Sequence, residues 1–477
     1  GEVTPMDATL NTATVSVKFS DNDLGLNAVL NFGESVTKKF TIENTGTADA
    51  KVKMYFDRMI NTYTEGSLTY TLSYSETEDG PYTEVINKTN VPKSKNASKK
   101  ILANSLTIPV GKTYYYELEI TLNYLNDINQ DEDINATFNT KFKVEDINSR
   151  NVVEEIIASS QGVRTEFDDL ATTDEGVFEM EDDYGMSYYY RGAVTNNYVK
   201  FAGFYWRIIR VNGDGSLRIM YDGTQAYANG TDNISRFIKS KHAYNTNYDD
   251  AKYVGWMYGP TGTTASTSKE EAQTNTADSD IKGVVDAWYK TNIEDAGYGN
   301  AVSDTLFCND RSTPGKEATD WSYDTGLGYG TNYTGYGAFA RTSVYNKLAS
   351  SPTFKCPEKN DAFTVNDTSK GNGALTYSVG LITADEVLSA GSGKFGSTYN
   401  TTYYLNRGPN YWYWSLSPLE LASAGGYTFV VSNGRLSYAR VYDEGRIAPV
   451  INLSAEFASY LIGDGTMENP YHTEQEK

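Results

Sequence analysis

The stretch 36–57, VTKKFTIENTGTADAKVKMYFD, consists of two strand-like runs on either side of a Thr-Gly turn. The residues before it alternate between apolar and polar with period two, which is typical of a half-buried strand. The apolar members of that earlier run are Ala13, Val15, Val17 and Phe19. Similar runs divided by turns continue to residue 145 without a helical period. We therefore predict an all-β sandwich over residues 1–145.

The next segment, 146–186, changes character. Val152, Val153, Ile156 and Ile157 fall at helical spacing, with Asp and Ser nearby as caps. The acidic run EFDDLATTDEGVFEMEDDYG follows. We predict a short helix and an acidic linker between two domains.

Residues 187–475 combine strand and helix patterns. The hairpin signal Asn212-Gly213-Asp214-Gly215 joins two apolar-aromatic runs. DSDIKGVVDAWYKTNI is amphipathic, RTSVYNKL and ITADEVLSA predict shorter helices, and strands return near the end. This mixture predicts an α+β domain.

The first twenty residues contain a change of phase. Met6, Ala8 and Leu10 have the opposite parity to the run that begins at Ala13. Because a shift of one residue moves every side chain to the other face, two separate strand pieces explain the change. Residues 1–12 could then add to an exposed edge of a neighbouring copy as a donor strand. A bulge within one intramolecular strand is the alternative.

Composition excludes several classes of function. The chain has a net charge of -21, from 62 Asp and Glu against 41 Lys and Arg. Such a charge disfavours binding to nucleic acid or to anionic membrane surfaces. No run of about 18 apolar residues occurs, so no membrane insertion is expected. Tyr outnumbers Phe by 39 to 18, a composition suited to binding or assembly surfaces.

The sequence lacks recognisable catalytic motifs. His242 and His472 are its two histidines, which disfavours zinc and histidine-based catalysis. A carboxylate pair for glycoside cleavage stays open, although no pair stands out. We predict that the protein is not an enzyme.

An acidic loop offers one metal candidate. Asp127, Asn129, Asp131 and Asp133 alternate as at the start of a calcium loop. Glu132 stands where such a loop needs Gly, and Phe138 where it needs Glu. A solvated acidic turn is therefore the other interpretation, and no cofactor other than calcium is indicated.

Several segments of the second domain carry a resemblance. VKFAGFYWRIIRVNGDGS, LTYSVGLITADEV, YWYWSLSP, GRIAPVINL and GDGTMENPY, together with the two cysteine segments, resemble bacterial surface proteins with a C-type-lectin-like domain. That fold is distantly akin to formylglycine-generating-enzyme-like domains. The resemblance spans about 187–471 and implies a binding or display role at the cell surface, without naming a ligand.

The first domain more loosely resembles the TasA/camelysin fibre proteins. LGLNAVLNFGESVTKKFTIENTGTADAKVKM is similar to their opening strands, and YLNDINQDEDINATF to their late hairpin. Those proteins are jelly-roll-like sandwiches in which the N-terminal segment of one subunit fills a groove in the next. The resemblance implies the same role for residues 1–12.

Cys308 and Cys356 are the two thiols of the chain. In an exported protein, two lone cysteines favour one disulfide, and two unpaired thiols are the alternative. The chain begins with Gly1 and carries no signal sequence, as the mature form of an exported protein or an artificial start would.

The stretch 410–418, NYWYWSLSP, contains four consecutive aromatic rings. The resemblance implies that it is a core strand. Strand alternation then sends Trp412 and Trp414 inward and leaves Tyr411 and Tyr413 nearer a loop-covered surface, where they could contact a ligand.

Two functions follow from these patterns. The first is a structural subunit of an extracellular bacterial filament, with other copies of the chain as its partners. The alternative is a monomeric surface adhesin that binds a glycan or protein through its second domain.

Overall fold

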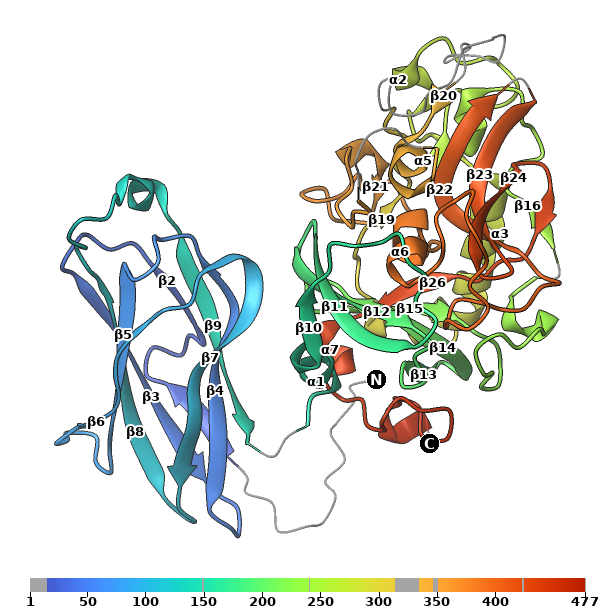
Figure 1. Cartoon of the computed structure of the whole chain (residues 1–477). Helices are drawn as coiled ribbons and strands as arrows, with labels where there is room; N and C mark the ends of the chain where they lie inside the picture. The colour runs from blue at the N-terminus through green and yellow to red at the C-terminus, as the bar shows by residue number, and fades with distance from the viewer. Residues whose placement is uncertain are drawn as a thin grey trace. The chain divides into compact units, whose positions relative to one another are not determined.

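The structure is a computed structural model that describes residues 15–147, 150–239, 241–313, 334–345, 351–422 and 424–476. The chain divides into two compact units, Gly1–Arg150 and Asn151–Lys477, and each has its own hydrophobic core (Figure 1). Met6, Ala8 and Leu10 lie outside the described residues.

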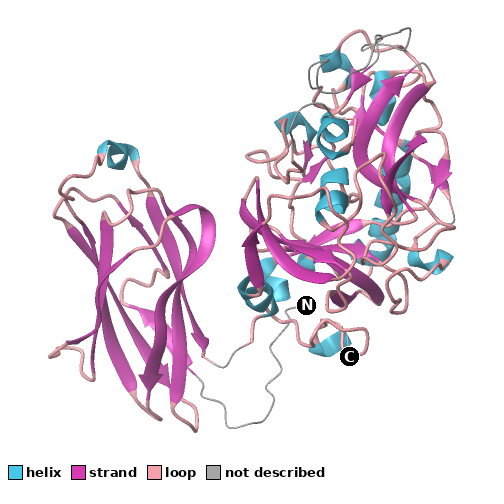
Figure 2. Ribbon diagram, viewed as in Figure 1, coloured by secondary structure: helices cyan, strands magenta, loops and turns pink. Residues whose placement is uncertain are grey.

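The first unit is a sandwich of two antiparallel sheets, visible as two layers of strands in Figure 2. One sheet has the order β1-β3-β8-β5-β6, and the other has the order β2-β9-β4-β7. The elements are β1 (Val15–Phe19), β2 (Gly25–Ala28), β3 (Ser35–Asn44), β4 (Ala50–Asn61), β5 (Leu68–Ser75), β6 (Thr83–Asn90), β7 (Ser94–Ile108), β8 (Thr113–Leu122), the 3-10 helix η1 (Asp131–Asn135) and β9 (Phe138–Asp146). The predicted β-sandwich is confirmed.

The sandwich core follows directly from alternation. β3 pairs with β8 in an unbroken register from Ser35 opposite Thr121 to Glu43 opposite Thr113. Phe40 and Ile42 of β3 therefore point inward and are buried, and Val52 and Met54 of β4 meet them from the other sheet. Burial of this apolar row is the main stabilising contribution to the unit.

The second unit is built around a larger sheet with the order β10-β11-β12-β14-β15-β26, with β13 paired to β14. Its strands are β10 (Ser160–Val163), β11 (Asp174–Asp182), β12 (Gly185–Gly192), β13 (Tyr198–Phe201), β14 (Phe204–Val211), β15 (Leu217–Tyr221) and β26 (Val450–Leu453). Figure 1 shows β26, from the end of the chain, beside β15. Long-range pairing therefore holds this sheet together.

A second sheet has the order β20-β22-β23-β24, and three two-stranded ladders complete the β structure. These strands are β16 (His242–Ala243), β17 (Met257–Tyr258), β18 (Ala277–Asp278), β19 (Phe307–Cys308), β20 (Thr334–Gly335), β21 (Ala362–Phe363), β22 (Tyr413–Ala422), β23 (Gly425–Ser432), β24 (Arg435–Arg440) and β25 (Glu444–Gly445).

Short helices connect these sheets. The α-helices are α1 (Val152–Ala158), α2 (Lys269–Ala272), α3 (Asp280–Tyr289), α5 (Gly337–Thr342), α6 (Ala384–Ser389) and α7 (Ala455–Ala458). The π-helix η4 (Lys290–Glu294) extends α3, and the 3-10 helices are η2 (Ile234–Arg236), η3 (Ala251–Val254), η5 (Gly299–Ala301), η6 (Lys359–Asp361) and η7 (Glu474–Glu476). The second unit thus combines strands with helices as predicted, while its assignment to the C-type-lectin-like fold stays a prediction.

The predicted linker is wrong. The helix exists as α1, which Asn151 caps by accepting a hydrogen bond from the backbone N of Glu154. The acidic run after it, however, forms β11, which pairs with β12 from Asp174 to Asp182. Its inward Val177 is buried in the core of the second unit. Acidic residues alternate in this run with only a few apolar ones, so the strand resembles a solvated linker in the sequence.

Two local predictions also change. The hairpin around Asn212–Gly215 is confirmed by β14 and β15, but the run before it turns at Ala202-Gly203 to make the additional strand β13. The predicted helices α3 and α6 are confirmed. Of the helix expected at RTSVYNKL, only Arg341 and Thr342 are helical, and they are the last two residues of α5. Thr383 caps α6 in a reciprocal pair with Glu386.

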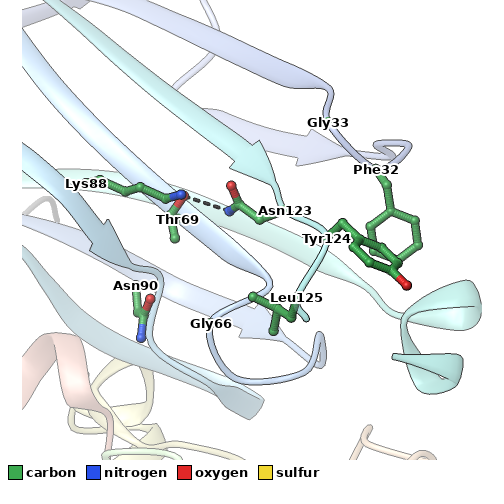
Figure 3. Close-up of a pocket in the computed structure, with 9 residues that line it drawn as sticks. All are labelled: Phe32, Gly33, Gly66, Thr69, Lys88, Asn90, Asn123, Tyr124 and Leu125. Carbon is green, nitrogen blue, oxygen red and sulfur yellow. Dashed lines mark hydrogen bonds between the residues drawn. The ribbon is translucent and has the colours of Figure 1, made fainter. Parts of the chain in front are cut away.

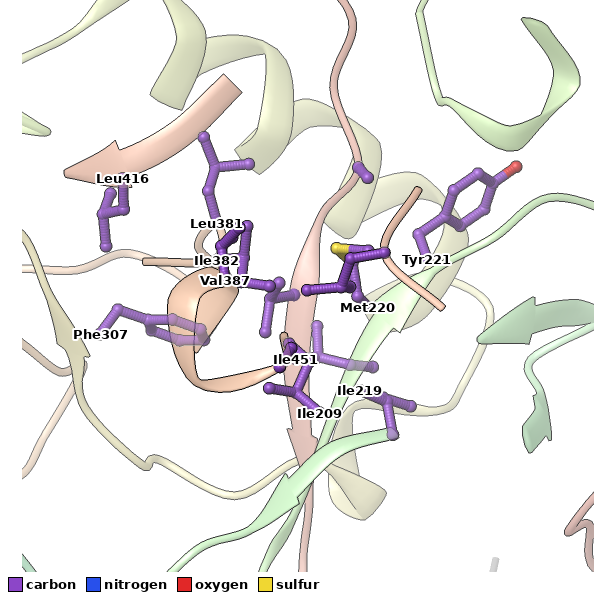
Figure 4. Packing of buried hydrophobic residues seen from close by; sticks show 14 of the residues in the cluster. Ile209, Ile219, Met220, Tyr221, Phe307, Leu381, Ile382, Val387, Leu416 and Ile451 are labelled. Carbon is purple, nitrogen blue, oxygen red and sulfur yellow. The ribbon is translucent and has the colours of Figure 1, made fainter. Parts of the chain in front are cut away.

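The core of the second unit lies where α6 covers the larger sheet. Figure 4 shows Val387 of α6 beside Met220 of β15, and Ile451 of β26, which pairs with β15, belongs to the same cluster. Segments separated by more than two hundred residues in sequence meet there. The core therefore depends on the complete second unit.

Candidate functional site

The first unit exposes strand edges on one side of the sandwich. β1 pairs only with β3 among the described strands, so its other edge is open. On the facing sheet, β2 covers β9 only from Phe138 to Lys141, and the backbone N of Phe142 makes a last bond of 2.8 Å to the carbonyl O of Leu24. Past Phe142, no described strand pairs with β9 on the side of β2.

These two edges face each other across the sandwich. The ring of Phe19 at the end of β1 lies with its centroid 5.8 Å from that of Phe142 in β9. Val15 and Val17 continue the inward row of β1, and Val144 continues that of β9. We call these five residues the β1–β9 edge.

The β1–β9 edge is incompletely buried. Val15, Val17, Phe19 and Val144 pack against the core but are only half-buried. By contrast, Phe40 in the neighbouring strand β3 is 1% exposed. An open backbone edge next to a partly exposed apolar row is a template for a further strand.

A buried lysine closes one end of this edge. Lys38 of β3 is 3% exposed and lies with Nζ 2.7 Å from the Asp21 carboxylate and 2.8 Å from the carbonyl O of Gly25. The hydrogen bond from Lys38 lowers the pKa of Asp21. The same ammonium lies 5.2 Å from the centroid of the Phe19 ring. Lys38 therefore ties the β1–β2 connection to β3 and leaves the Val15 end of β1 open.

A shallow pocket of about 530 Å³ lies where the chain leaves β8 at Asn123, Tyr124 and Leu125 (Figure 3). Its aromatic wall consists of Phe32 and Tyr124, whose rings meet edge to face at 5.9 Å. Asn123 at its base donates a hydrogen bond of 2.8 Å to the hydroxyl of Thr69, drawn as a dashed line in Figure 3. The side chain of Lys88 adds one positive charge. No sequence motif indicated this pocket, because its residues come from separate loops and from the strands β5 and β6.

Calcium binding by Asp127, Asn129, Asp131 and Asp133 stays a prediction. Among the described residues, no group of three or more His, Cys, Asp or Glu side chains is arranged to hold a metal. Asp133 is buried and instead accepts hydrogen bonds from the backbone N of Thr64 at 2.7 Å and the hydroxyl of Ser67 at 2.6 Å. Asp131 begins the 3-10 helix η1, and Asp127 lies in the turn before it with a φ of 61°. Acids that alternate along a loop point in different directions, and they converge on one ion only when the loop backbone folds around that ion.

The aromatic stretch 411–414 differs from the prediction. Trp414 is fully buried as expected, and its indole Nε1 donates to the carbonyl O of His242 at 2.8 Å. Tyr413 is also buried, at 1% exposure, and its hydroxyl donates to the carbonyl O of Leu405 at 2.6 Å. Trp412 and Tyr411 are half-buried. The prediction that Tyr413 lies near the surface is therefore wrong.

The reason is the position of the strand. β22 begins at Tyr413, so strand alternation does not extend back to Tyr411 and Trp412. From Tyr413 to Leu419 both faces of β22 are covered, and every residue is buried. A strand enclosed on both faces buries Tyr and Trp alike.

The predicted disulfide is confirmed. Cys308 and Cys356 are bonded, and their Cα atoms are 5.5 Å apart. Next to Cys308 lies a cavity of about 20 Å³ whose lining includes Arg210, Arg218, Arg341 and Glu386. Its volume suits a single water molecule and no larger ligand. These charges are therefore part of the core.

The arginines around this cavity are paired. Arg218 Nε and Arg210 Nε donate to Glu386 at 2.6 and 3.0 Å, and Arg210 also reaches Asp182 at 2.7 Å. Although burial acts to raise it, the two guanidinium charges hold the pKa of Glu386 at about 2. The Arg210–Arg218–Glu386 cluster joins β14, β15 and α6.

The described helices include none that is both long and apolar enough to cross a membrane.

Comparisons with known proteins are limited. No family model and no curated protein matches the chain. Solved structures that match include a family 3a carbohydrate binding module from the scaffolding of Clostridium thermocellum, with 13% identity over 28% of this chain and 96% of the module, at a TM-score of 0.17.

Two other matches cover smaller parts of their proteins. The alkylpurine DNA glycosylase of Pseudomonas fluorescens is 16% identical over 25% of this chain, at a TM-score of 0.14, and the chain spans about a quarter (24%) of its length. The infectious bursal disease virus subviral particle protein is 11% identical over 30% of this chain and 35% of its own, at a TM-score of 0.19. TM-scores this low carry no argument about function.

Proposed function

We propose that this chain is a structural subunit of an extracellular bacterial filament. Residues 1–12 of one copy add as a strand along the β1–β9 edge of the next copy. The observation that carries the proposal is the half-buried apolar row of this edge beside an open backbone. Because each subunit offers one donor segment and one acceptor edge, the contact is heterologous and propagates into a filament.

Strand addition satisfies both partners physically. Main-chain hydrogen bonds to the open edge provide affinity, and alternate side chains provide register. Met6, Ala8 and Leu10 have the period of two that places all three on the inner face, against Val15, Val17 and Val144. Asp7 and Thr9 then point to solvent.

Two further properties support an extracellular location. A disulfide persists in oxidising compartments, and the Cys308–Cys356 bond fits that setting. The net charge of -21 keeps separate filaments from sticking to one another or to nucleic acid. The second unit is then displayed along the filament.

The test is electron microscopy of the purified full-length chain together with sedimentation. We expect filaments from the unchanged protein and none from Leu10→Asp, because a buried carboxylate opposes strand addition. Thr9→Asp, one position away and on the outer face, is the matched control and should still assemble. On the acceptor side, Val17→Lys should block assembly and Ser16→Lys should not.

Mixing the blocked variants distinguishes strand exchange from general damage. Leu10→Asp retains an acceptor edge and Val17→Lys retains a donor segment, so the mixture should form dimers that cannot grow. A synthetic peptide of residues 1–14 should likewise shorten filaments of the unchanged protein. Monodisperse monomers of the unchanged chain after long incubation, or normal filaments of Leu10→Asp, would overturn the proposal.

A further inference from the structure

A row of aromatic side chains crosses the outer face of β23 and β24, strands that lie side by side with β22 in Figure 1. We call it the tyrosine–arginine belt. It consists of Tyr248, Tyr442, Arg440, Tyr427, Tyr438, Phe395 and Tyr345.

Neighbouring rings of the belt are in contact. The ring centroids of Tyr248 and Tyr442 are 4.7 Å apart, and those of Tyr427 and Tyr438 are 5.7 Å apart. Tyr248 and Tyr438 are 44% and 55% exposed, which is high for large rings on a strand or an ordered loop. Tyr side chains offer a rigid apolar face with a polar tip at a small loss of conformational entropy.

Arg440 joins the two pairs of rings. Its Nη1 donates to the hydroxyl of Tyr442 at 2.7 Å, and its guanidinium lies 5.6 Å from the centroid of the Tyr442 ring. Hydrogen bonds to the hydroxyls of Tyr427 and Tyr442 raise the pKa of Arg440. Within the described chain, no Asp or Glu side chain forms an ion pair with the guanidinium of Arg440. The Asp443 carboxylate accepts a hydrogen bond from the backbone N of Arg440 and not from its guanidinium. Most other described arginines of the second unit pair with carboxylates.

The paired strands β23 and β24 fix the positions of the belt residues that they carry. Tyr427 stands opposite Arg440 and Phe429 opposite Tyr438 in an unbroken register. The β23–β24 turn at Gly434 has a φ of 75°, and a Cβ there would lie 1.7 Å from the carbonyl O of Asn400, so only glycine fits. On the same face, Phe429 is fully buried, and its ring centroid lies 5.9 Å from that of Phe395. The rings are therefore held in place before any ligand arrives.

The acid in register with the belt carries little charge at neutral pH. Glu420 of β22 pairs with Tyr427, and burial raises the pKa of its carboxyl to about 8. An anionic ligand over Arg440 therefore meets little repulsion from this side chain, although the chain as a whole is acidic.

We propose that the tyrosine–arginine belt binds an acidic saccharide. Sugar rings pack their C–H faces on the exposed tyrosine rings, and a uronic acid carboxylate bonds to the guanidinium of Arg440, whose planar fork matches a carboxylate. Charge complementarity decides between ligand classes, because Arg440 is a positive group without a carboxylate partner on a strongly acidic protein. This site goes beyond the proposed assembly role and does not depend on it.

The experiment measures binding of galacturonic acid oligomers to the full-length chain by calorimetry, with neutral galactose oligomers as the comparison. The Leu10→Asp variant is used as background, so that binding is read independently of assembly. We expect the acidic oligomer to bind and the neutral one to bind at least roughly tenfold more weakly, as expected for loss of one charge-assisted contact.

Variants locate the site. Tyr438→Ala and Arg440→Gln should each weaken binding roughly tenfold, the effect of one stacking or charged contact. Tyr460→Ala changes a tyrosine of the second unit that is 46% exposed and lies outside the belt, so it is the matched control and should bind normally. Circular dichroism of each variant reports folding.

Three outcomes overturn the proposal. Equal affinity for neutral and acidic oligomers would remove the role of Arg440. Undiminished binding by a folded Tyr438→Ala variant would place the saccharide elsewhere. Absence of binding by either oligomer at millimolar concentration would show that the belt takes no uronic acid saccharide.

Discussion

The two units bury different chemistry. In the described part of the sandwich, Lys38 and Asp133 are the buried charged residues, and the other buried side chains are apolar or uncharged. In the second unit, buried arginines and carboxylates lie throughout the core, as in the Arg236–Asp222 pair at 2.7 Å. Two stacked sheets need only alternation to fit together, whereas the second unit joins short elements from distant parts of the chain.

Charge pairs provide the directional contacts that such a core needs. Arg218 and Glu386 are separated by 168 residues, and Arg311 reaches Asp361 across 50. A buried pair contributes little net stability compared with apolar packing, but loss of one partner leaves a buried charge. The second unit should therefore respond to charge substitutions that the sandwich tolerates.

The largest expected effect is that of Glu386→Ala. Removal of the Glu386 carboxylate leaves Arg210 and Arg218 buried without the group that they share. This should lower the free energy of unfolding of the second unit by about 3–5 kcal/mol. Urea unfolding followed by tryptophan fluorescence measures this, because all six Trp belong to the second unit. The control is Asp295→Ala, which breaks an exposed pair with Lys290 and should leave the transition in place. Equal shifts in both variants would contradict the comparison.

Reduction of the Cys308–Cys356 bond should have the next largest effect. The bond closes a loop with a sequence separation of 48, so in the chain-entropy model its loss destabilises the unit by up to about 4 kcal/mol. Cys308→Ser with Cys356→Ser, compared with the oxidised parent in calorimetry, should lower one melting transition and leave that of the sandwich unchanged. A shift of both transitions would mean that the units unfold together.

Glu420 provides a pH-dependent test of the second unit. Burial raises the pKa of its carboxyl to about 8 in the folded chain, whereas the unfolded chain ionises near the usual value of 4.5. The folded state then binds more protons between these values, so stability is complete below about pH 4.5 and falls as the pH rises towards 8. Glu420→Gln should remove this fall and stabilise the unit by about 2 kcal/mol at pH 8, after allowance for its partial exposure.

The measurement is the urea midpoint of the second unit between pH 5 and 9. Glu456→Gln, at an exposed acid of the same unit, is the control and should keep the slope of the unchanged protein. A parallel pH dependence in Glu420→Gln and the unchanged protein would exclude Glu420 as the cause.

The smallest effect concerns the sandwich and calcium. Removal of calcium with a chelator should leave the melting temperature unchanged, because the Asp133 carboxylate already accepts hydrogen bonds from Thr64 and Ser67. Asp133→Asn should destabilise the sandwich by about 1–2 kcal/mol through loss of charge-assisted hydrogen bonds. Asp131→Asn is the control. A stabilisation by added calcium that disappears in Asp131→Asn would restore the calcium loop.

Local patterns predicted much of the fold. Alternation predicted the sandwich strands, Asn212–Gly215 predicted the β14–β15 hairpin, and the capped amphipathic run predicted α3. Both β1 and the strand that holds Phe142 and Val144 were predicted, but the meeting of these two edges across the sandwich was not. The belt had a sequence signal that the prediction missed, since Tyr427 and Arg440 lie at equal distances on either side of the turn at Asn433-Gly434.

The sequence by itself determined the elements whose stability is local: alternating strands, capped helices and glycine turns, where each residue responds to neighbours a few positions away. The tertiary structure alone decided that the acidic run becomes β11, that Tyr413 is buried beside Trp414, and that Arg210 and Arg218 share Glu386. These outcomes depend on which distant segment covers a given face. Burial and charge pairing depend on contacts between distant segments, and the order of residues along the chain does not specify those contacts.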